Sequence, residues 1–344
     1  MDSLTQIALG GAVGELLLGK KVGYRAALWG AALGTLPDLD VLANPFLDSV
    51  DQLYFHRNIT HSIFFALAAS PLIGWLIDKF HKHPEVGWTR WANLSFWVIL
   101  THILIDLPTS YGTQLFQPFS DYPATLDSIY IIDPLYTLPL LIGLISALFL
   151  RRDSVWRSRV NSAGLIISTL YMLSGLAIKT HVNSVYQESF TQAYGSYEDM
   201  KTTPNGPSVF LWSGYMIRQD TVYHSLYSVF DSSRDLEFQA IPRNSEYIGP
   251  YEDDRALEAL LWFSRGYYSV EKNGPEDIIL YDLRFGRADF WMSEDEEYVW
   301  GNQLEFDEDG KAHSFDMVIP PIDIRTGNLQ LLWNRVWGYK PPDR

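Results

Sequence analysis

The 344-residue chain contains no cysteine, which excludes disulfide bonds, thiolate zinc sites and cysteine nucleophiles. It is also short of basic residues: 26 Lys and Arg stand against 41 Asp and Glu, a formal net charge of −15. A nucleic-acid-binding protein generally carries a basic surface, so we expect no nucleic-acid partner.

The charge is distributed unevenly along the chain. Residues 1–180 hold 13 acidic and 12 basic residues, whereas residues 181–344 hold 28 and 14. The first region is nearly neutral and strongly apolar, and the second carries almost all of the negative charge. We therefore predict a membrane-embedded helical domain over residues 1–180, followed by an acidic, β-rich soluble domain over residues 181–344.

Four stretches of the first region lack Lys, Arg, Asp and Glu altogether: Thr60–Ile77, Trp91–Ile105, Pro134–Leu150 and Asn161–Ile178. Their 15 to 18 residues come close to the length of a membrane-spanning helix, about 17–25 residues. Two further runs, Leu4–Gly19 and Val22–Leu36, are rich in Gly and Ala, which suits close helix packing in lipid. The sequence thus predicts a polytopic protein with four to six membrane helices; a soluble helical bundle is the alternative.

The basic residues of the first region indicate an orientation. If all six runs are helices of alternating direction, the connections after the first, third and fifth share one side of the membrane. These connections hold ten of the twelve Lys and Arg residues of the region. The positive-inside rule then makes that side cytoplasmic. We expect a multi-pass protein of the cytoplasmic membrane whose second domain is extracytoplasmic.

The second region has the pattern of antiparallel strands. Five segments alternate in polarity or are rich in aromatic and β-branched residues: Ala259–Val270, Asp277–Phe285, Ala288–Met292, Tyr298–Phe306 and Ser314–Ile319. Asp309-Gly310 is a turn signal. This spacing predicts a meander of strands.

Six residues that can bind metal ions fall in three clusters of the first region, all on its predicted extracytoplasmic side. They are Asp38 and Asp40, His56 and His61, and His102 and Asp106. His102 and Asp106 are four residues apart and share one helix face. His61 follows Asn58 and Thr60, either of which could cap a helix. Asp38 and Asp40 follow Pro37, which predicts an extended segment or a turn.

Imidazole nitrogens and carboxylate oxygens are suitable zinc ligands. Ionisable groups at the ends of apolar helices are costly unless they are paired or bind a metal, so together the six residues predict a site for one or two Zn²⁺ or other divalent ions. Taken singly, each has a structural explanation as a turn residue, a cap or an intrahelical pair. Arg57 could hold an anionic substrate oxygen, or it could be an ordinary surface arginine.

Four motifs carry a resemblance to a known family: MDSLTQIALGGAVG at the start, PDLD (37–40), HRNITHS (56–62) and THILIDLPTSYGTQLFQP (101–118). Together they resemble the YdjM-type family of LexA-binding, inner-membrane-associated, metal-dependent hydrolases. The resemblance covers about residues 1–180, and LRFG (283–286) is similar to the tail of longer members. It implies hydrolase chemistry and a distant relation to zinc-dependent phospholipase C and the P1-type nucleases, which bind a small cluster of zinc ions.

One position departs from the family pattern. Many relatives carry a histidine where this chain has Gln6, and glutamine is a poor zinc ligand. The departure favours two metal ions over three, unless Asp2 takes the place of the missing ligand.

The leading interpretation is a membrane-bound hydrolase in which metal-activated water attacks a phosphoester of a lipid or envelope-associated substrate. The alternative is a non-catalytic membrane protein with a structural metal ion and a partner-binding C-terminal domain. A metal transporter is disfavoured because the candidate ligands cluster at one face of the membrane rather than along a path across it.

Overall fold

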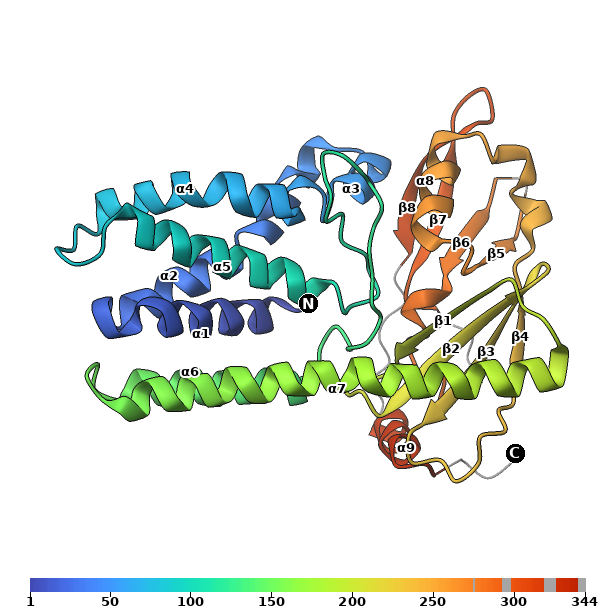
Figure 1. Ribbon diagram of the computed structural model, residues 1–344. Coiled ribbons are helices and arrows are strands. Elements are labelled where there is room, and N and C mark those ends of the chain that lie inside the picture. Colours follow the sequence, from blue (N-terminus) through green and yellow to red (C-terminus); the bar gives the residue numbers. More distant parts are fainter. Residues whose placement is uncertain (275, 293–297, 319–325, 340–344) are drawn as a thin grey trace. The chain divides into compact units, whose positions relative to one another are not determined.

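The computed structural model describes residues 1–274, 276–292, 298–318 and 326–339, and the chain divides into two compact units. The first unit comprises Met1–Asn44 and Phe55–Gly175, and the second comprises Pro45–Tyr54 and Leu176–Arg344. The first is helical and the second is rich in β-structure (Figure 1). The expected order, a helical region followed by a β-rich one, is confirmed.

Each of the six apolar runs forms a helix. In chain order these helices are α1 (Ser3–Val22), α2 (Tyr24–Gly34), α4 (Ile63–Phe80), α5 (Trp88–Asp106), α6 (Pro134–Phe149) and α7 (Val155–Tyr194). The 3₁₀ helices η1 (Pro37–Phe46) and η2 (Ile59–His61) lie between α2 and α4. Helix α7 continues past the end of its apolar run and is 40 residues long, so its residues belong to both units.

Helices α1 and α2 pack backbone against backbone. A Cβ atom on Gly10 would overlap the carbonyl oxygen of Gly30, and a Cβ atom on Gly30 would overlap that of Gly10. Only glycine permits the two backbones to come this close. Small residues have the same role at helix–helix contacts in membrane proteins.

The outer surface of the first unit is apolar. Side chains of α4, α6 and α7 such as Leu72, Ile142 and Leu170 are 59%, 64% and 60% exposed. By length and composition, two helices of the described residues, Ile63–Phe80 and Val155–Tyr194, could cross a membrane, and Pro134–Phe149 is a shorter apolar helix. Only 22% of the apolar window of each candidate span is buried, whereas the core helix of a soluble protein is mostly buried.

The second unit contains two four-stranded antiparallel sheets. The first has the order β1 (Asp199–Pro204), β2 (Leu211–Arg218), β3 (Thr221–Ser228) and β4 (Gln239–Pro242). The second has the order β5 (Tyr268–Lys272), β6 (Ile278–Asp282), β7 (Gly301–Phe306) and β8 (Ala312–Val318). In both sheets neighbouring strands follow one another in the chain, so the predicted meander is confirmed.

The strand prediction over Ala288–Met292 is wrong, because Ala288–Trp291 form a turn. The strand prediction over Ala259–Val270 is wrong for its first half. Residues Arg255–Ser264 form helix α8, which buries Ala256, Leu260 and Phe263 on one face, and strand β5 begins at Tyr268. The run ALEALLWF contains strong helix formers, which outweigh the aromatic residues that suggested a strand. The unit also contains most of helix α3 (Ser49–Phe55), helix α9 (Thr326–Val336) and the 3₁₀ helices η3 (Ser245–Tyr247), η4 (Gly249–Tyr251) and η5 (Leu283–Phe285).

Candidate metal centre

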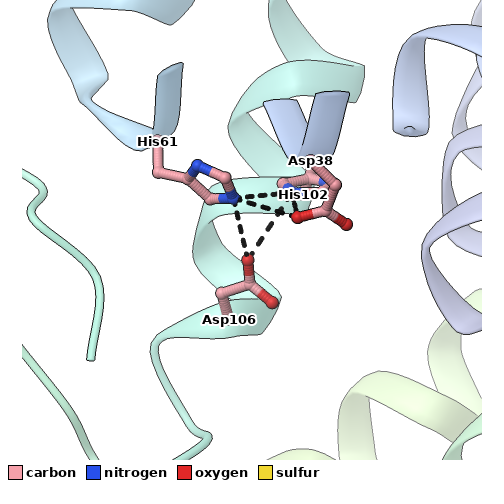
Figure 2. A group of neighbouring side chains, drawn as sticks. All are labelled: Asp38, His61, His102 and Asp106. Atoms are coloured by element: carbon pink, nitrogen blue, oxygen red, sulfur yellow. Dashed lines mark hydrogen bonds and ion pairs between the residues drawn. The ribbon is translucent and has the colours of Figure 1, made fainter. Parts of the chain in front are cut away.

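Four of the six predicted ligands converge at one end of the helical unit (Figure 2). Asp38 comes from η1, His61 is the last residue of η2, and His102 and Asp106 lie in the last turns of α5. His61, His102 and Asp106 are buried, whereas the Asp38 side chain is 25% exposed. The pairing of His102 with Asp106 on one helix face is confirmed.

The two elements that carry Asp38 and His61 differ from the sequence prediction. Asp38 lies in a 3₁₀ helix rather than in an extended segment or an isolated turn. Neither Asn58 nor Thr60 caps the helix after His61: that helix, α4, is capped by Ser62, whose hydroxyl accepts a hydrogen bond from the Phe65 N–H at 3.0 Å. His61 therefore precedes α4 instead of lying in its first turn.

The four donor atoms lie within 4.8 Å of one another, and five of their six separations are those of a tetrahedral metal site. His61 Nε2 lies 3.2 Å from both His102 Nε2 and Asp38 Oδ1. Asp106 Oδ2 lies 3.5 Å from each imidazole Nε2, and His102 Nε2 lies 3.5 Å from Asp38 Oδ1. A regular tetrahedron with edges of this length has its centre about 2.0–2.1 Å from each corner, which matches zinc–nitrogen and zinc–oxygen bond lengths.

The hydrogen bonds of the two imidazoles direct lone pairs into this space. His102 Nδ1 donates to the Gly34 carbonyl oxygen at 2.6 Å, which leaves Nε2 of the neutral ring as an acceptor. His61 Nδ1 faces Asp40 Oδ2 at 3.6 Å and Thr60 Oγ1 at 3.1 Å. Burial lowers the pKa of His61, which favours its neutral form.

Two lone pairs and two carboxylates therefore face one another, and Asp106 Oδ2 is buried without a hydrogen-bond partner among the described residues. This arrangement of acceptors fits a divalent metal ion.

Asp40 and His56 do not join the four-donor cluster. Asp40 Oδ1 lies 3.1 Å from His56 Nδ1, and Asp40 Oδ2 accepts a hydrogen bond from the Arg57 backbone N–H at 2.9 Å. Asp40 Oδ2 also faces the Nδ1 side of His61, away from the donor atom Nε2. A carboxylate in this place orients a metal-binding imidazole and raises its basicity.

Arg57 is not a surface residue: it is buried beside Asp106, with 4% of its area exposed. Its Nη2 lies 3.4 Å from Asp106 Oδ1, and its Nη1 donates to Thr109 Oγ1 at 3.2 Å. Its guanidinium lies 5.0 Å from the ring centre of Tyr111. The Nε of Arg57 is buried without a hydrogen-bond partner in the described structure, and the residue has a φ of 56°, which is uncommon outside glycine.

Gln6, the departure from the family pattern, supports the site as a hydrogen-bond donor. Its Nε2 donates to Asp106 Oδ1 at 3.0 Å, where the Met1 amine also contacts this carboxylate. Asp2 does not replace the missing histidine, because its carboxylate caps α1 by accepting from the Thr5 N–H at 3.0 Å.

Two groups of the site were not predicted from the sequence: the Gly34 carbonyl oxygen and the Thr109 hydroxyl. No residue pattern reveals a backbone acceptor or a hydroxyl that orients an arginine.

The candidate ligands all lie in the part of the chain that matches a known protein family. The model of the family described as YdjM inner membrane protein matches residues 1–182. The chain is 30% identical over 144 residues to an uncharacterized protein, YfhP, of Bacillus subtilis (strain 168), a match that covers 39% of this chain and 42% of the relative. No solved structure matches. Because the family model covers more than half of its length, the chain belongs to the YdjM inner membrane protein family.

Proposed function

We propose that this protein is a membrane-bound, metal-dependent hydrolase, with Asp38, His61, His102 and Asp106 as the ligands of its metal ion. The observation that supports this most strongly is the set of four donor atoms that lie within 4.8 Å of one another, one of them a buried carboxylate oxygen without a hydrogen-bond partner among the described residues. The donor set of two imidazoles and two carboxylates suits zinc best. When bound, such an ion would lower the pKa of a coordinated water toward about 7 and so supply a hydroxide nucleophile.

The surrounding residues have separate roles in this proposal. Asp40 lies 3.6 Å from His61 Nδ1, whose hydrogen-bond partner is the Thr60 hydroxyl, and the Gly34 carbonyl orients the ring of His102 by accepting from its Nδ1. The cation of Arg57 offsets part of the negative charge of Asp106. Its Nε–H is buried and has no partner among the described residues, so it would donate to an anionic oxygen of a substrate that reaches the buried side of the metal site. Asp38 is the exposed ligand, so substrate would approach from its side.

The proposed substrate class is a phosphoester of a lipid or an envelope-associated molecule. An arginine is suited to hold a phosphate oxygen. Helix α5 separates the cluster at Asp106 from the basic connection before Trp88 by about 27 Å, at 1.5 Å per residue. This length is close to the thickness of the hydrocarbon core of a bilayer, about 30 Å, which would put the site at the membrane–water interface.

The length of α5 is also consistent with a membrane-spanning topology. We propose that all six apolar helices lie in the cytoplasmic membrane, with the basic connections inside and the metal site and the C-terminal domain outside. The ten basic residues of the three connections support this orientation. A second metal ion would need Asp40 and His56, which bind each other in this structure.

One observation favours the alternative function. Four protein donors complete a tetrahedral zinc site, as in structural sites, whereas catalytic sites keep one position open. If Asp38 never leaves the metal ion to make room for water or substrate, the ion would only hold the helix ends together. The protein would then have another role, such as binding an envelope partner through its C-terminal domain.

The first experiment measures metal content per chain and hydrolysis of a chromogenic phosphodiester, on detergent-purified protein. The variants are His61→Ala/His102→Ala and Arg57→Gln, and His83→Ala is the control histidine in the connection between α4 and α5. We expect zinc and activity in the wild type and the control, neither in the double variant, and zinc without activity in Arg57→Gln. Absence of metal from the wild type would refute the site, and metal without activity on soluble or lipid phosphodiesters would favour the structural alternative.

A further inference from the structure

A second site lies at the other end of the helical unit, far from the metal ligands. A cavity of about 350 Å³ opens beside α2 and is lined by Tyr24, Arg25, Leu28, Trp29, Ala32 and His81. Five of these residues form one face of α2, and His81 follows the last residue of α4. The ring centres of Trp29 and His81 are 5.7 Å apart, so the connection between α4 and α5 forms one wall of the cavity.

The lining changes from charged to apolar along α2. Tyr24 and Arg25 are in the first turn of the helix, next to the end of α1. Leu28 and Ala32 lie one and two turns further on, so that Ala32 is about 10 Å beyond Arg25 along the axis. Leu28 is 60% exposed, and the cavity wall beyond the first turn is apolar.

The charged end of the cavity belongs to a basic end of the helical unit. Residues 15–25, 78–90 and 151–159 hold ten Lys or Arg and four Asp or Glu. The connections between α4 and α5 and between α6 and α7 lie at the same end of the unit as the last turn of α1 (Figure 1). Arg152 Nη1 donates to the Lys21 carbonyl oxygen at 3.1 Å, which joins two of these segments.

The acidic residues of this end do not neutralise Arg25. Glu15 is paired with Arg157, and Asp153 is paired with Arg151. No ion pair in the described part of the chain joins the other two, Asp78 and Glu85, to Arg25. Among the described residues, the guanidinium of Arg25 makes no hydrogen bond or ion pair. Arg25, whose guanidinium has no partner among the described residues, is thus one of the residues that line this largely apolar cavity.

We propose that this cavity binds one anionic phospholipid of the bilayer. Its phosphate would pair with Arg25 beside the Tyr24 hydroxyl, and one acyl chain would lie against Leu28, Trp29 and Ala32. Basic pockets between helices on the cytoplasmic side are suited to anionic headgroups, and the order of charge and apolar surface along α2 matches that of a lipid. The site is independent of the metal centre and of any hydrolase activity.

The test is native mass spectrometry of the full-length protein, titrated with phosphatidylglycerol or with phosphatidylcholine of the same acyl chains. Two variants probe the cavity: Arg25→Gln removes the cation, and Ala32→Phe fills the apolar part. Lys82→Gln is the matched control, because Lys82 is an exposed cation of the same basic end that does not line the cavity. Thermal unfolding without added lipid verifies that each variant is folded.

We expect the wild type to retain one phosphatidylglycerol in preference to phosphatidylcholine. Arg25→Gln should weaken phosphatidylglycerol binding about fivefold, the effect of one basic residue near an anionic headgroup, and leave phosphatidylcholine unchanged. Ala32→Phe should weaken both lipids, and Lys82→Gln should change neither by more than twofold. An equal loss in Lys82→Gln and Arg25→Gln, or full binding by Ala32→Phe, would overturn the proposal, since the lipid would then be attracted by diffuse charge and not held in the cavity.

Discussion

The Nε2 atoms of His61 and His102 lie 3.2 Å apart, and the Nδ1 atom of each ring already faces an acceptor. Two neutral imidazoles whose Nδ1 atoms carry the protons would direct lone pairs at each other, which is unfavourable in a buried site. Removal of a cation between them should therefore destabilise the fold around it.

This arrangement predicts that a chelator lowers the thermal stability of the wild type. A ligand present at about 1,000 times its Kd stabilises the folded state by about 4 kcal/mol, so treatment with EDTA should lower Tm by several degrees and added Zn²⁺ should restore it. Differential scanning fluorimetry in detergent measures the change. The variant His102→Ala should be insensitive to both treatments, and an equal response of this variant would place the bound ion elsewhere.

Asp40 should affect metal affinity without being a ligand. Its Oδ2 faces His61 Nδ1 at 3.6 Å, and loss of such a partner lowers the metal affinity of a site about 10–100-fold. We expect Asp40→Asn to keep one ion per chain but to lose it to a weaker competing chelator than the wild type does. Loss of the ion at every chelator strength would instead make Asp40 a direct ligand.

The pattern of apolar runs predicted the six helices because each run is long enough to dominate its local structure, and the i, i+4 spacing of His102 and Asp106 placed both on one face of α5. The same reasoning could not separate Asp38 from Asp40. That choice depends on the 3₁₀ geometry of η1, which turns Asp38 toward the two histidines and Asp40 toward His56. The first turn of α4 was misplaced because Asn58, Thr60 and Ser62 are all good caps, and only packing selects Ser62.

A buried ion pair should be important for the stability of the helical unit. Arg157 of α7 makes a bidentate pair with Glu15 of α1, at 2.6 and 2.7 Å, and both side chains are almost fully buried. Loss of one partner leaves an unpaired buried charge, at a cost of about 3–5 kcal/mol. We expect Glu15→Gln to lower the thermal stability markedly.

The exposed pair of Arg151 and Asp153 is the matched comparison for this prediction. It has the same chemistry and lies in the connection that leads into α7, but both side chains are largely open to solvent. Asp153→Asn should leave the unfolding temperature unchanged, because water screens such a pair. If both variants behaved alike, burial would not be what makes the Glu15–Arg157 pair important.

Asp133 predicts a pH dependence of stability. It caps α6, its carboxylate accepts from the Leu135 N–H at 3.0 Å and from the Tyr171 hydroxyl at 2.8 Å, and burial raises its pKa to about 6. In the unfolded chain this pKa is about 3.9, so between about pH 4 and pH 6 the folded state binds more protons than the unfolded one. The contribution of this group to stability is therefore present below pH 4, decreases as the pH rises through 6, and is lost above it.

Asp133→Asn keeps a capping oxygen without the charge, so it should stabilise the protein by about 1–3 kcal/mol at pH 7.5 and have little effect at pH 4. Unfolding measured at both pH values checks the sign, and a variant that is less stable than the wild type at pH 7.5 would mean that the ionised carboxylate is favoured in the folded state.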